Sequence, residues 1–359
     1  MTRVYFATNR NFLSAESPWF GNNPTKDGDL RFGYSNIDKS NDFKVTGVTV
    51  LPDNQPEGSF AVFAELQQIM KVQNRDTLIF IHGYNTGFTK ALSDAARLID
   101  CLTAATPDAY EPNVIAYCWP SADELLEYPR DRKEAEASAP GLARAIQKYF
   151  TFMRQQKDGQ KGKPKQKRSE RCNKSVHLLC HSMGNYLFRY ALQSLASDNA
   201  QPSAMFREAL LMAADEDNDA FDDNDKLLPL FRMARRITVY FNKDDEALAA
   251  SHDINFNMTR LGATGPLHTH GIPPMIKPVD VTQVVHGLID DDGLIQHDYY
   301  NDPSCKKVHA DMAWTLLGAP SETIAGRKYN AQAGKYVLQR GTSLQEMVDR
   351  ILLRRSPDI

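Results

Sequence analysis

Short apolar runs alternate along this chain with longer segments in which apolar positions recur every three to four residues. The short runs are rich in β-branched and aromatic residues, which is typical of strands buried on both faces, whereas the longer segments are typical of helices packed on a sheet. The predicted strands are 4–9, 43–51, 77–83, 113–120, 175–181, 206–214, 236–241 and 277–285, and the predicted helices are 66–72, 89–105, 141–156, 186–196, 227–234 and 308–318. This order predicts βαβ units, and hence one doubly wound α/β domain with a mostly parallel sheet over residues 1–318.

Three segments depart from this alternation. Residues 121–140 form a long excursion between a strand and a helix, and they predict either a cap over a functional site, with Leu125 and Tyr128 facing a substrate, or a structural surface helix. Residues 157–174 carry eight Lys or Arg against two acids, which indicates a solvated, flexible loop or, alternatively, a docking patch for an anionic partner. Residues 319–359 follow the last predicted helix, and we expect a C-terminal helical extension there.

Composition narrows the class of protein. The chain has 359 residues and a formal net charge of −3, so no bulk attraction to nucleic acid or to an anionic membrane is expected. No apolar stretch approaches the roughly 18 residues that a membrane span requires, and the first residues do not resemble a secretion signal. The five cysteines are odd in number and scattered, which fits free buried thiols in a reducing compartment better than a disulfide framework. We therefore expect a cytoplasmic protein.

The motifs indicate neither a metal nor an organic cofactor. The chain has no CxxC pair of the kind that forms a thiolate zinc site. His268 and His270 have no third ligand at motif spacing, so a loop is the simpler interpretation. The acidic run 215–225 lacks the glycine and glutamate that a calcium loop begun at Asp215 requires, which predicts a solvated loop.

The strongest chemical signal is the end of the predicted strand 175–181. Its apolar run stops at His181, Ser182, Met183 and Gly184, and a helix-like stretch follows at once. A tight turn from strand to helix exposes a serine hydroxyl and directs the amide of the next residue toward an oxyanion. The usual pattern is G-x-S-x-G, and here Cys180 occupies the first position. The pattern predicts Ser182 as a nucleophile, with the Met183 amide as an oxyanion donor.

A second motif, FIHGYN at 80–85, ends a predicted strand two elements before the serine. An α/β-hydrolase has its other oxyanion amide at this point. Gly83 lets the backbone approach the substrate, and the N–H of Tyr84 is the predicted donor. We expect His82, Gly83, His181 and Tyr128 to line the substrate site. The alternative is that Gly83 is an ordinary turn glycine and His82 a capping group.

Six motifs together resemble a known family. RVYFATNR at the start, HGYN, CWPS at 118–121, HSMGN, KDDEAL at 243–248 and HDYY at 297–300 occur in this order. The chain resembles a largely bacterial family of α/β-hydrolases, catalogued as a domain of unknown function within the esterase/lipase superfamily. The resemblance covers nearly everything from residue 1 to about 318, and it implies a hydrolase fold and a serine triad without a shared substrate. Family members usually have alanine where this chain has Cys180.

The resemblance also guides the choice of acid and base. In this fold the acid follows the serine in the chain and the histidine comes last. Matching KDDEAL to the family pattern selects Asp245, with Asp244 second and with Asp215 and Asp217 as outside candidates. Of the nine histidines, three follow the last predicted strand, and His309 falls within the predicted helix 308–318, which leaves His286 and His297 as candidates. We predict His297 as the base because it opens the family-like HDYY motif and stands on a loop that can fold back over the serine.

These features predict a serine hydrolase that cleaves carboxylic esters through an acyl-enzyme, with a small-molecule ester as substrate and no cofactor. An amidase or thioesterase with the same triad is the first alternative. The second is a non-catalytic binding module with the same fold. Such a module would be free to lose Ser182 or both late histidines, whereas all three are present in the expected order.

Overall fold

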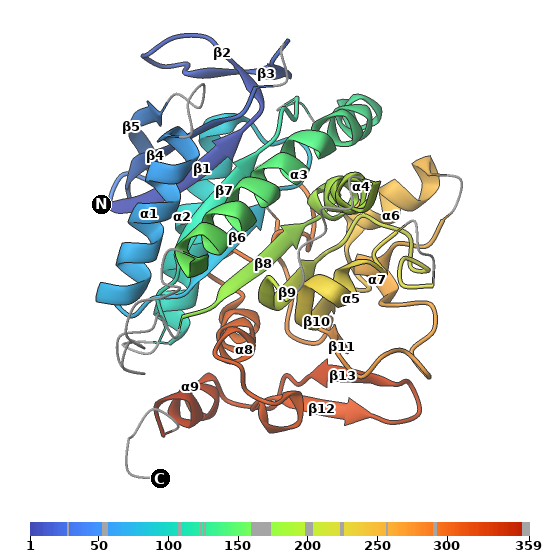
Figure 1. Ribbon diagram of the computed structural model, residues 1–359. Coiled ribbons are helices and arrows are strands. Elements are labelled where there is room, and N and C mark those ends of the chain that lie inside the picture. The colour runs from blue at the N-terminus through green and yellow to red at the C-terminus, as the bar shows by residue number, and fades with distance from the viewer. Residues whose placement is uncertain are drawn as a thin grey trace.

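The computed structural model describes residues 1–26, 29–51, 57–106, 110–122, 124, 127–158, 174–197, 204–222, 226–255, 258–289 and 293–353. Among these residues, eleven strands form one sheet in the order β12-β13-β11-β10-β9-β8-β6-β7-β1-β4-β5 (Figure 1). The strands are β1 (Thr2–Thr8), β4 (Arg31–Asp38), β5 (Lys44–Leu51), β6 (Thr77–Ile81), β7 (Asn113–Cys118), β8 (Val176–His181), β9 (Phe206–Met212), β10 (Ala234–Phe241), β11 (Ile276–Asp280), β12 (Arg327–Asn330) and β13 (Lys335–Leu338).

The eight central strands of the sheet, from β1 to β13 in the sheet order, are parallel, and antiparallel pairs close both edges. All six residues of β7 and of β8 are buried, which is why both strands read as continuous apolar runs. A further short hairpin consists of β2 (Arg10–Phe12) and β3 (Phe20–Pro24).

Helices cover both faces of the sheet, and each face has its own core. Side chains of α1 (Glu57–Val72), α3 (Tyr128–Asp158) and α4 (Met183–Ser197) pack on one face, and those of α2 (Phe88–Ala105) and α8 (Lys306–Leu316) pack on the other. The remaining helices are α5 (Leu230–Met233), α6 (Glu246–Ile254), α7 (Leu261–Thr264) and α9 (Leu344–Leu353), with a 3-10 turn at Ser321–Thr323. Alternate strand residues serve the two cores: Cys180 faces the α3–α4 side, and Leu179 the α2–α8 side. This is the predicted α/β-hydrolase architecture.

The predictions missed three strands near the edges of the sheet, although the strand predicted at 43–51 is confirmed as the edge strand β5. A helical extension was expected over 319–359, and 344–353 do form the helix α9, but 327–330 and 335–338 form β12 and β13, which join the sheet next to β11. Gly334, with a φ of +61°, lies in the turn between them. The strand β4 was also missed, because Gly33 interrupts its apolar pattern. An added Cβ at Gly33 would lie 2.0 Å from the carbonyl oxygen of Thr49, so the packing of β4 against β5 requires glycine there.

Of the segment 121–140, the structure describes residues 121, 122, 124 and 127–140. From Tyr128 onward it is the first half of α3, a continuous 31-residue helix that contains Pro140. Ala135 and Ala139 of this half are buried in the core, so it packs on the sheet as a structural helix. Leu125, and the basic segment over 159–173, lie outside the described residues.

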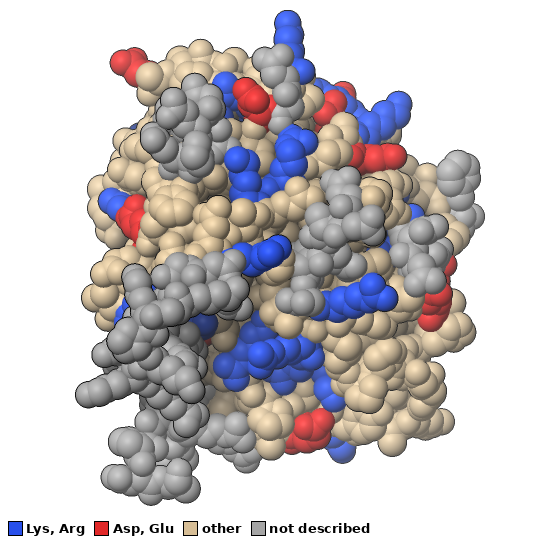
Figure 2. Space-filling view, viewed as in Figure 1, with Lys and Arg blue, Asp and Glu red and all other residues tan. Residues whose placement is uncertain are grey.

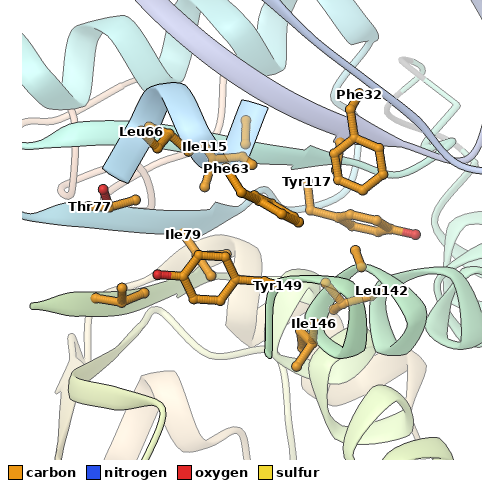
Figure 3. A pocket seen from close by; sticks show the side chains of 14 residues that line it. Phe32, Phe63, Leu66, Thr77, Ile79, Ile115, Tyr117, Leu142, Ile146 and Tyr149 are labelled. Carbon is orange, nitrogen blue, oxygen red and sulfur yellow. The ribbon is translucent and has the colours of Figure 1, made fainter. Parts of the chain in front are cut away.

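A cavity of about 40 Å³ lies between the sheet and the helices α1 and α3 (Figure 3). Its lining comes from core side chains such as Phe63, Ile115 and Leu142, and none of the predicted site residues contributes to it. On the same side of the molecule, Lys and Arg side chains stand in separate groups between uncharged residues (Figure 2). In the part of the chain that the structure describes, no helix is long and apolar enough to cross a membrane.

Candidate active site

Ser182 lies at the tip of a strained turn between β8 and α4. Its φ is +49°, a left-handed conformation that is uncommon for a residue with a side chain. Backbone bonds hold it: the Ser182 N–H donates to Met212 O at 3.0 Å, and its carbonyl accepts the amides of Asn185 at 3.0 Å and of Asp215 at 3.1 Å. The turn is therefore anchored to the ends of two neighbouring elements, β9 and α4.

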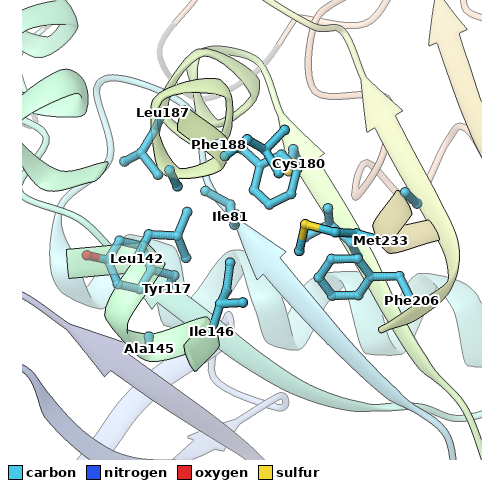
Figure 4. Close-up of a cluster of buried hydrophobic side chains, with 14 of the residues drawn as sticks. Ile81, Tyr117, Leu142, Ala145, Ile146, Cys180, Leu187, Phe188, Phe206 and Met233 are labelled. Carbon is cyan, nitrogen blue, oxygen red and sulfur yellow. The ribbon is translucent and has the colours of Figure 1, made fainter. Parts of the chain in front are cut away.

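The residues around Ser182 explain how so tight a turn is packed. A Cβ added at Gly184 would lie 2.6 Å from Ile81 O and 2.7 Å from His82 O, so α4 crosses the end of β6 too closely for any side chain. Cys180 points away from the turn into the apolar cluster with Leu187 and Phe188 (Figure 4). Its position buries the thiol completely and raises its pKa, so Cys180 acts there as a small core side chain.

The loop after β6 lies directly beside the serine. A Cβ added at Gly83 would lie 2.9 Å from Ser182 Cβ and 3.4 Å from Ser182 Oγ. A side chain at position 83 would collide with Ser182, so the close approach of the two segments requires glycine there. This contact brings together the HGYN motif and the serine turn, which contain the two predicted oxyanion donors Tyr84 and Met183.

His82 belongs to the protein interior. Its ring stacks on Trp119 with centroids 5.3 Å apart and an angle of 8° between the planes, and it is 1% exposed. Burial also lowers the pKa of His82 well below its usual value. The expected contact of His82 with substrate is thus not favoured by its position, because the stacking on Trp119 occupies one face of the ring. Its backbone oxygen instead accepts the Trp119 Nε1–H at 2.9 Å.

Asp245 and His297, which are 52 positions apart, form a buried hydrogen-bonded pair. His297 Nδ1 lies 2.8 Å from Asp245 Oδ2, and both side chains are at most 2% exposed. The other carboxylate oxygen, Oδ1, accepts the Leu248 N–H at 3.0 Å, so Asp245 also caps α6. Burial raises the pKa of Asp245, while the neighbouring His297 opposes that rise. The carboxylate is therefore oriented at both oxygens and directs one toward the imidazole.

The loop that carries His297 is attached to the loop that carries Asp245. The Glu246 N–H donates to Ile295 O at 3.2 Å, and Asn242 Nδ2 donates to Gln296 O at 3.1 Å. The His297 ring lies 4.7 Å from the ring of His181, the residue that precedes Ser182. These contacts place the imidazole next to the serine turn.

The competing candidates lie elsewhere or have other partners. Asp244 and His286 are exposed, and His286 Nε2 lies 2.7 Å from Gln283 O. Asp217 is paired with Arg260 at 2.9 Å and Lys226 at 3.1 Å, so its carboxylate is neutralised by cations of the chain itself. Asp215 is buried, but its carboxylate bonds to the hydroxyls of Tyr128 and Ser251.

Tyr128 reaches the site through its ring. Its hydroxyl donates to Asp215 Oδ2 at 2.7 Å and lies 2.9 Å from Ser251 Oγ. The ring packs edge-on against the ring of Tyr84, with centroids 5.4 Å apart. Burial raises the pKa of Tyr128 to about 12, which keeps its hydroxyl neutral. The hydroxyl is thus used inside the protein, and only the ring of Tyr128 is adjacent to the predicted oxyanion loop.

His181 lies at the centre of the cluster. Its ring packs between His297 and Tyr300, and its Nε2 lies 3.3 Å from Asp298 Oδ1. Burial lowers the pKa of His181 to about 3, so the ring is neutral near pH 7. Ligand-type atoms of His181, His297 and Asp298 lie within 4.8 Å of one another. Since Nδ1 of His297 is bonded to Asp245, a metal could use only the Nε2 that a nucleophilic serine requires, and we assign no metal to this group.

Sequence reasoning missed two polar residues that shape the site. Asn185 Nδ2 donates to Cys180 O and to Ser182 O, both at 3.1 Å, and so closes the serine turn from inside. Asp131, in α3, is completely buried and accepts the backbone N–H of Asn85 at 3.1 Å. Asn185 belongs to the HSMGN motif and could have been noticed, whereas nothing near Asp131 in the sequence indicates its partner.

Comparison with known proteins places this arrangement in a family. The family model described as "Alpha/beta hydrolase of unknown function (DUF900)" matches residues 59–163 and 164–311. An uncharacterized protein of Nostoc sp. is 27% identical over 230 residues, which are 57% of this chain and 54% of that protein. The chain therefore spans about half the length of the curated relative that it matches.

Solved structures with a similar fold share little sequence with this chain. Aspergillus fumigatus lipase B matches with 10% identity and a TM-score of 0.34, over 78% of this chain and 61% of the lipase. An esterase of Pyrobaculum calidifontis matches with 10% identity and a TM-score of 0.33, over 74% of this chain and 94% of the esterase. Likenesses at this level carry no argument about substrate.

Proposed function

Because the chain belongs to the family of α/β hydrolases of unknown function, we propose that it is a serine hydrolase that cleaves carboxylic esters through an acyl-enzyme. The observation that carries the proposal is the buried bond of 2.8 Å between Asp245 and His297, beside a serine with a φ of +49°. A core histidine needs no oriented carboxylate, and a core serine needs no strained backbone. Their combination beyond the carboxyl ends of the central strands favours nucleophilic catalysis.

In the first half of the proposed reaction, Ser182 Oγ attacks the carbonyl carbon of the ester while His297 Nε2 takes the hydroxyl proton. Asp245 fixes the imidazole so that Nδ1 carries a proton and Nε2 can accept one, and it stabilises the imidazolium that forms. The amides of Tyr84 and Met183 donate to the oxyanion of the tetrahedral intermediate. Collapse of that intermediate breaks the bond to the alkoxy oxygen, which leaves as the alcohol with the proton from His297.

In the second half, water adds to the acyl carbon of the acylated Ser182. His297 Nε2 accepts a proton from this water, and the same amides hold the second oxyanion. Breakage of the bond to Ser182 Oγ releases the carboxylic acid, and the serine regains its proton from His297. The residues of the chain are sufficient for every proton transfer in this scheme.

The test combines a covalent probe with a substrate panel. A fluorophosphonate should label the protein once, at Ser182, and Ser182→Ala should lose both labelling and hydrolysis of p-nitrophenyl esters from acetate to palmitate. A matched control is Ser251→Ala, because Ser251 is buried like Ser182 and bonds to the carboxylate of Asp215, but has no histidine partner in the described contacts. This variant should still be labelled.

Each outcome of this test has a definite meaning. Labelling that survives in Ser182→Ala and disappears in Ser251→Ala would overturn the assignment. Probe labelling without ester turnover, together with turnover of p-nitroanilides or acyl thioesters, would favour the amidase or thioesterase alternative. A wild-type protein that neither reacts with the probe nor hydrolyses any of these substrates would indicate a non-catalytic binding module.

A further inference from the structure

Four side chains from other parts of the chain form hydrogen bonds with the backbone of the loop that carries Tyr84. The Asn85 N–H donates to Asp131 Oδ2 at 3.1 Å, and the Thr86 N–H donates to Ser121 Oγ at 3.1 Å. The Thr86 carbonyl accepts from Arg10 Nη2 at 2.7 Å. On the other side of Tyr84, the His82 carbonyl accepts the Trp119 indole N–H at 2.9 Å. The backbone on both sides of the Tyr84 amide is therefore fixed.

Asp131 is the centre of this arrangement. Its Oδ2 accepts the Ser121 hydroxyl in addition to the Asn85 N–H, and its Oδ1 accepts the Ala122 N–H at 2.7 Å. One carboxylate thus joins three chain segments: α3, the turn after β7 and the loop after β6. It also orients the Ser121 hydroxyl, which has to donate to Asp131 in order to accept from Thr86.

Burying the carboxylate of Asp131 has a free-energy cost, because the charge is removed from water. The side chain is 0% exposed, and burial raises its pKa. Three donors and the nearby Arg10 offset part of that cost. The segment that they hold includes Asn85, whose φ of +53° is a left-handed conformation that asparagine tolerates better than most residues with a side chain.

We propose that Asp131 is a positioning residue for the oxyanion donor Tyr84, acting through the Asn85 amide and through Ser121. This inference rests on the proposed function, since it concerns the same reaction. An oxyanion donor is effective only when its N–H is already directed at the developing charge. If the loop could rotate, kcat would fall while the affinity for the substrate stayed the same. The described bonds of Asp131 go to Asn85, Ser121 and Ala122 and not to Ser182, so its effect is carried by the peptide between Tyr84 and Asn85.

The test replaces Asp131 by Asn, which keeps the shape but removes one acceptor and adds a donor that faces other donors. Asp131→Asn should lower kcat on a good ester by about 10- to 100-fold, while KM changes by less than about two-fold. Hydrogen exchange should accelerate at the amides of Asn85 and Thr86 and remain unchanged in α3. Ser121→Ala, which also removes the bond to Thr86, should give the same pattern with a smaller loss.

Glu134→Gln is the matched control. Glu134 lies one turn after Asp131 on the same helix and has no described bond to the loop. It should retain wild-type kcat and wild-type exchange at Asn85 and Thr86.

Two results would overturn the positioning role while leaving the proposed function intact. One is an unchanged kcat in Asp131→Asn with accelerated exchange at Asn85 and Thr86. The other is a loss of activity that only follows the loss of folded protein, with exchange accelerated throughout α3. A wild-type protein that hydrolyses no ester and does not react with a fluorophosphonate would overturn the proposed function itself, and the positioning role with it.

Discussion

Two buried carboxylates in this molecule are each paired with a basic side chain, and the pairs differ in what the base can do. Asp245 bonds to His297 at 2.8 Å, at the end of the sheet where Ser182 lies. Asp311, in α8, bonds to Arg327 of β12 through both oxygens, each at 2.7 Å. All four side chains are at most 2% exposed. The same burial therefore surrounds a base that can exchange a proton and one that cannot.

The remaining partners make the difference sharper. Arg327 Nη2 also donates to Tyr240 Oη at 3.2 Å and to Thr315 Oγ1 at 2.6 Å, so its guanidinium joins β12, β10 and α8. Asp245 uses its second oxygen to cap α6, and the ring of His297 lies 4.7 Å from the ring of His181, beside the serine turn. The arginine pair fastens an edge strand to the sheet, and the histidine pair orients a base. Four experiments test this contrast.

The largest expected effect is that of removing the base. His297→Ala should lower kcat/KM for a good ester by at least about 10⁴-fold, because the serine then has no proton acceptor. His286→Ala is the control, because His286 also lies between β11 and α8 but is exposed. Its kcat/KM should stay within about two-fold of wild type. Initial rates with one p-nitrophenyl ester decide between them. Collapse in His286→Ala with near-normal turnover in His297→Ala would reverse the assignment.

Removing the charge of Asp245 should lower the rate somewhat less than removing His297 does. Asp245→Asn should lower kcat by about 10³- to 10⁴-fold, since the asparagine cannot hold the required tautomer of His297. Asp244→Asn changes an exposed neighbour and should leave kcat unchanged. The comparison is made by steady-state kinetics at neutral pH. Equal losses in the two variants would mean that the bond to His297 does not determine the rate.

The arginine pair should show the opposite pattern, a loss of stability without a loss of activity. Arg327→Met leaves Asp311 buried without its partner and should lower the free energy of unfolding by about 3–5 kcal/mol. The kcat of the molecules that remain folded should be unchanged. Adding Asp311→Leu should restore much of the stability, because the unpaired charge is then gone. Denaturant unfolding measures both variants, and a stable Arg327→Met would contradict the fastening role.

The smallest effect concerns pH. Burial raises the pKa of Asp245 in the folded protein above its unfolded value, so its ionisation opposes folding above the folded-state pKa. Below the unfolded-state pKa of about 3.9 both states are protonated, and this opposition disappears. Asp245→Asn should therefore be more stable than wild type at pH 7, and the gain should shrink as the pH falls toward 4. Unfolding curves at several pH values measure it. A variant less stable than wild type at pH 7 would show that the ionised pair contributes net stability.

The central strands and the serine turn could be predicted because their signals are local. A strand buried on both faces must be apolar throughout, and a tight turn between strand and helix needs small residues at fixed spacing, as in Cys180 to Gly184. The strand β12, at one edge of the sheet, lacks such a requirement. In β12 three of the four residues are exposed, so its composition resembles that of a loop, and only its pairing with β13 makes it a strand.

The amino-acid sequence by itself determined the α/β order, the strained serine and the short set of acids and histidines that could serve it. Only the tertiary structure decided which members meet. Asp245 bonds to His297 across 52 positions, and Asp131 bonds to Asn85 across 46. The competing candidates for the acid and the base, Asp244 and His286, are exposed. Hydrogen bonds of this kind depend on distances of about 3 Å between atoms that the chain brings together only when the sheet has formed. Such distances cannot be predicted from the composition of the sequence or from the spacing of its motifs.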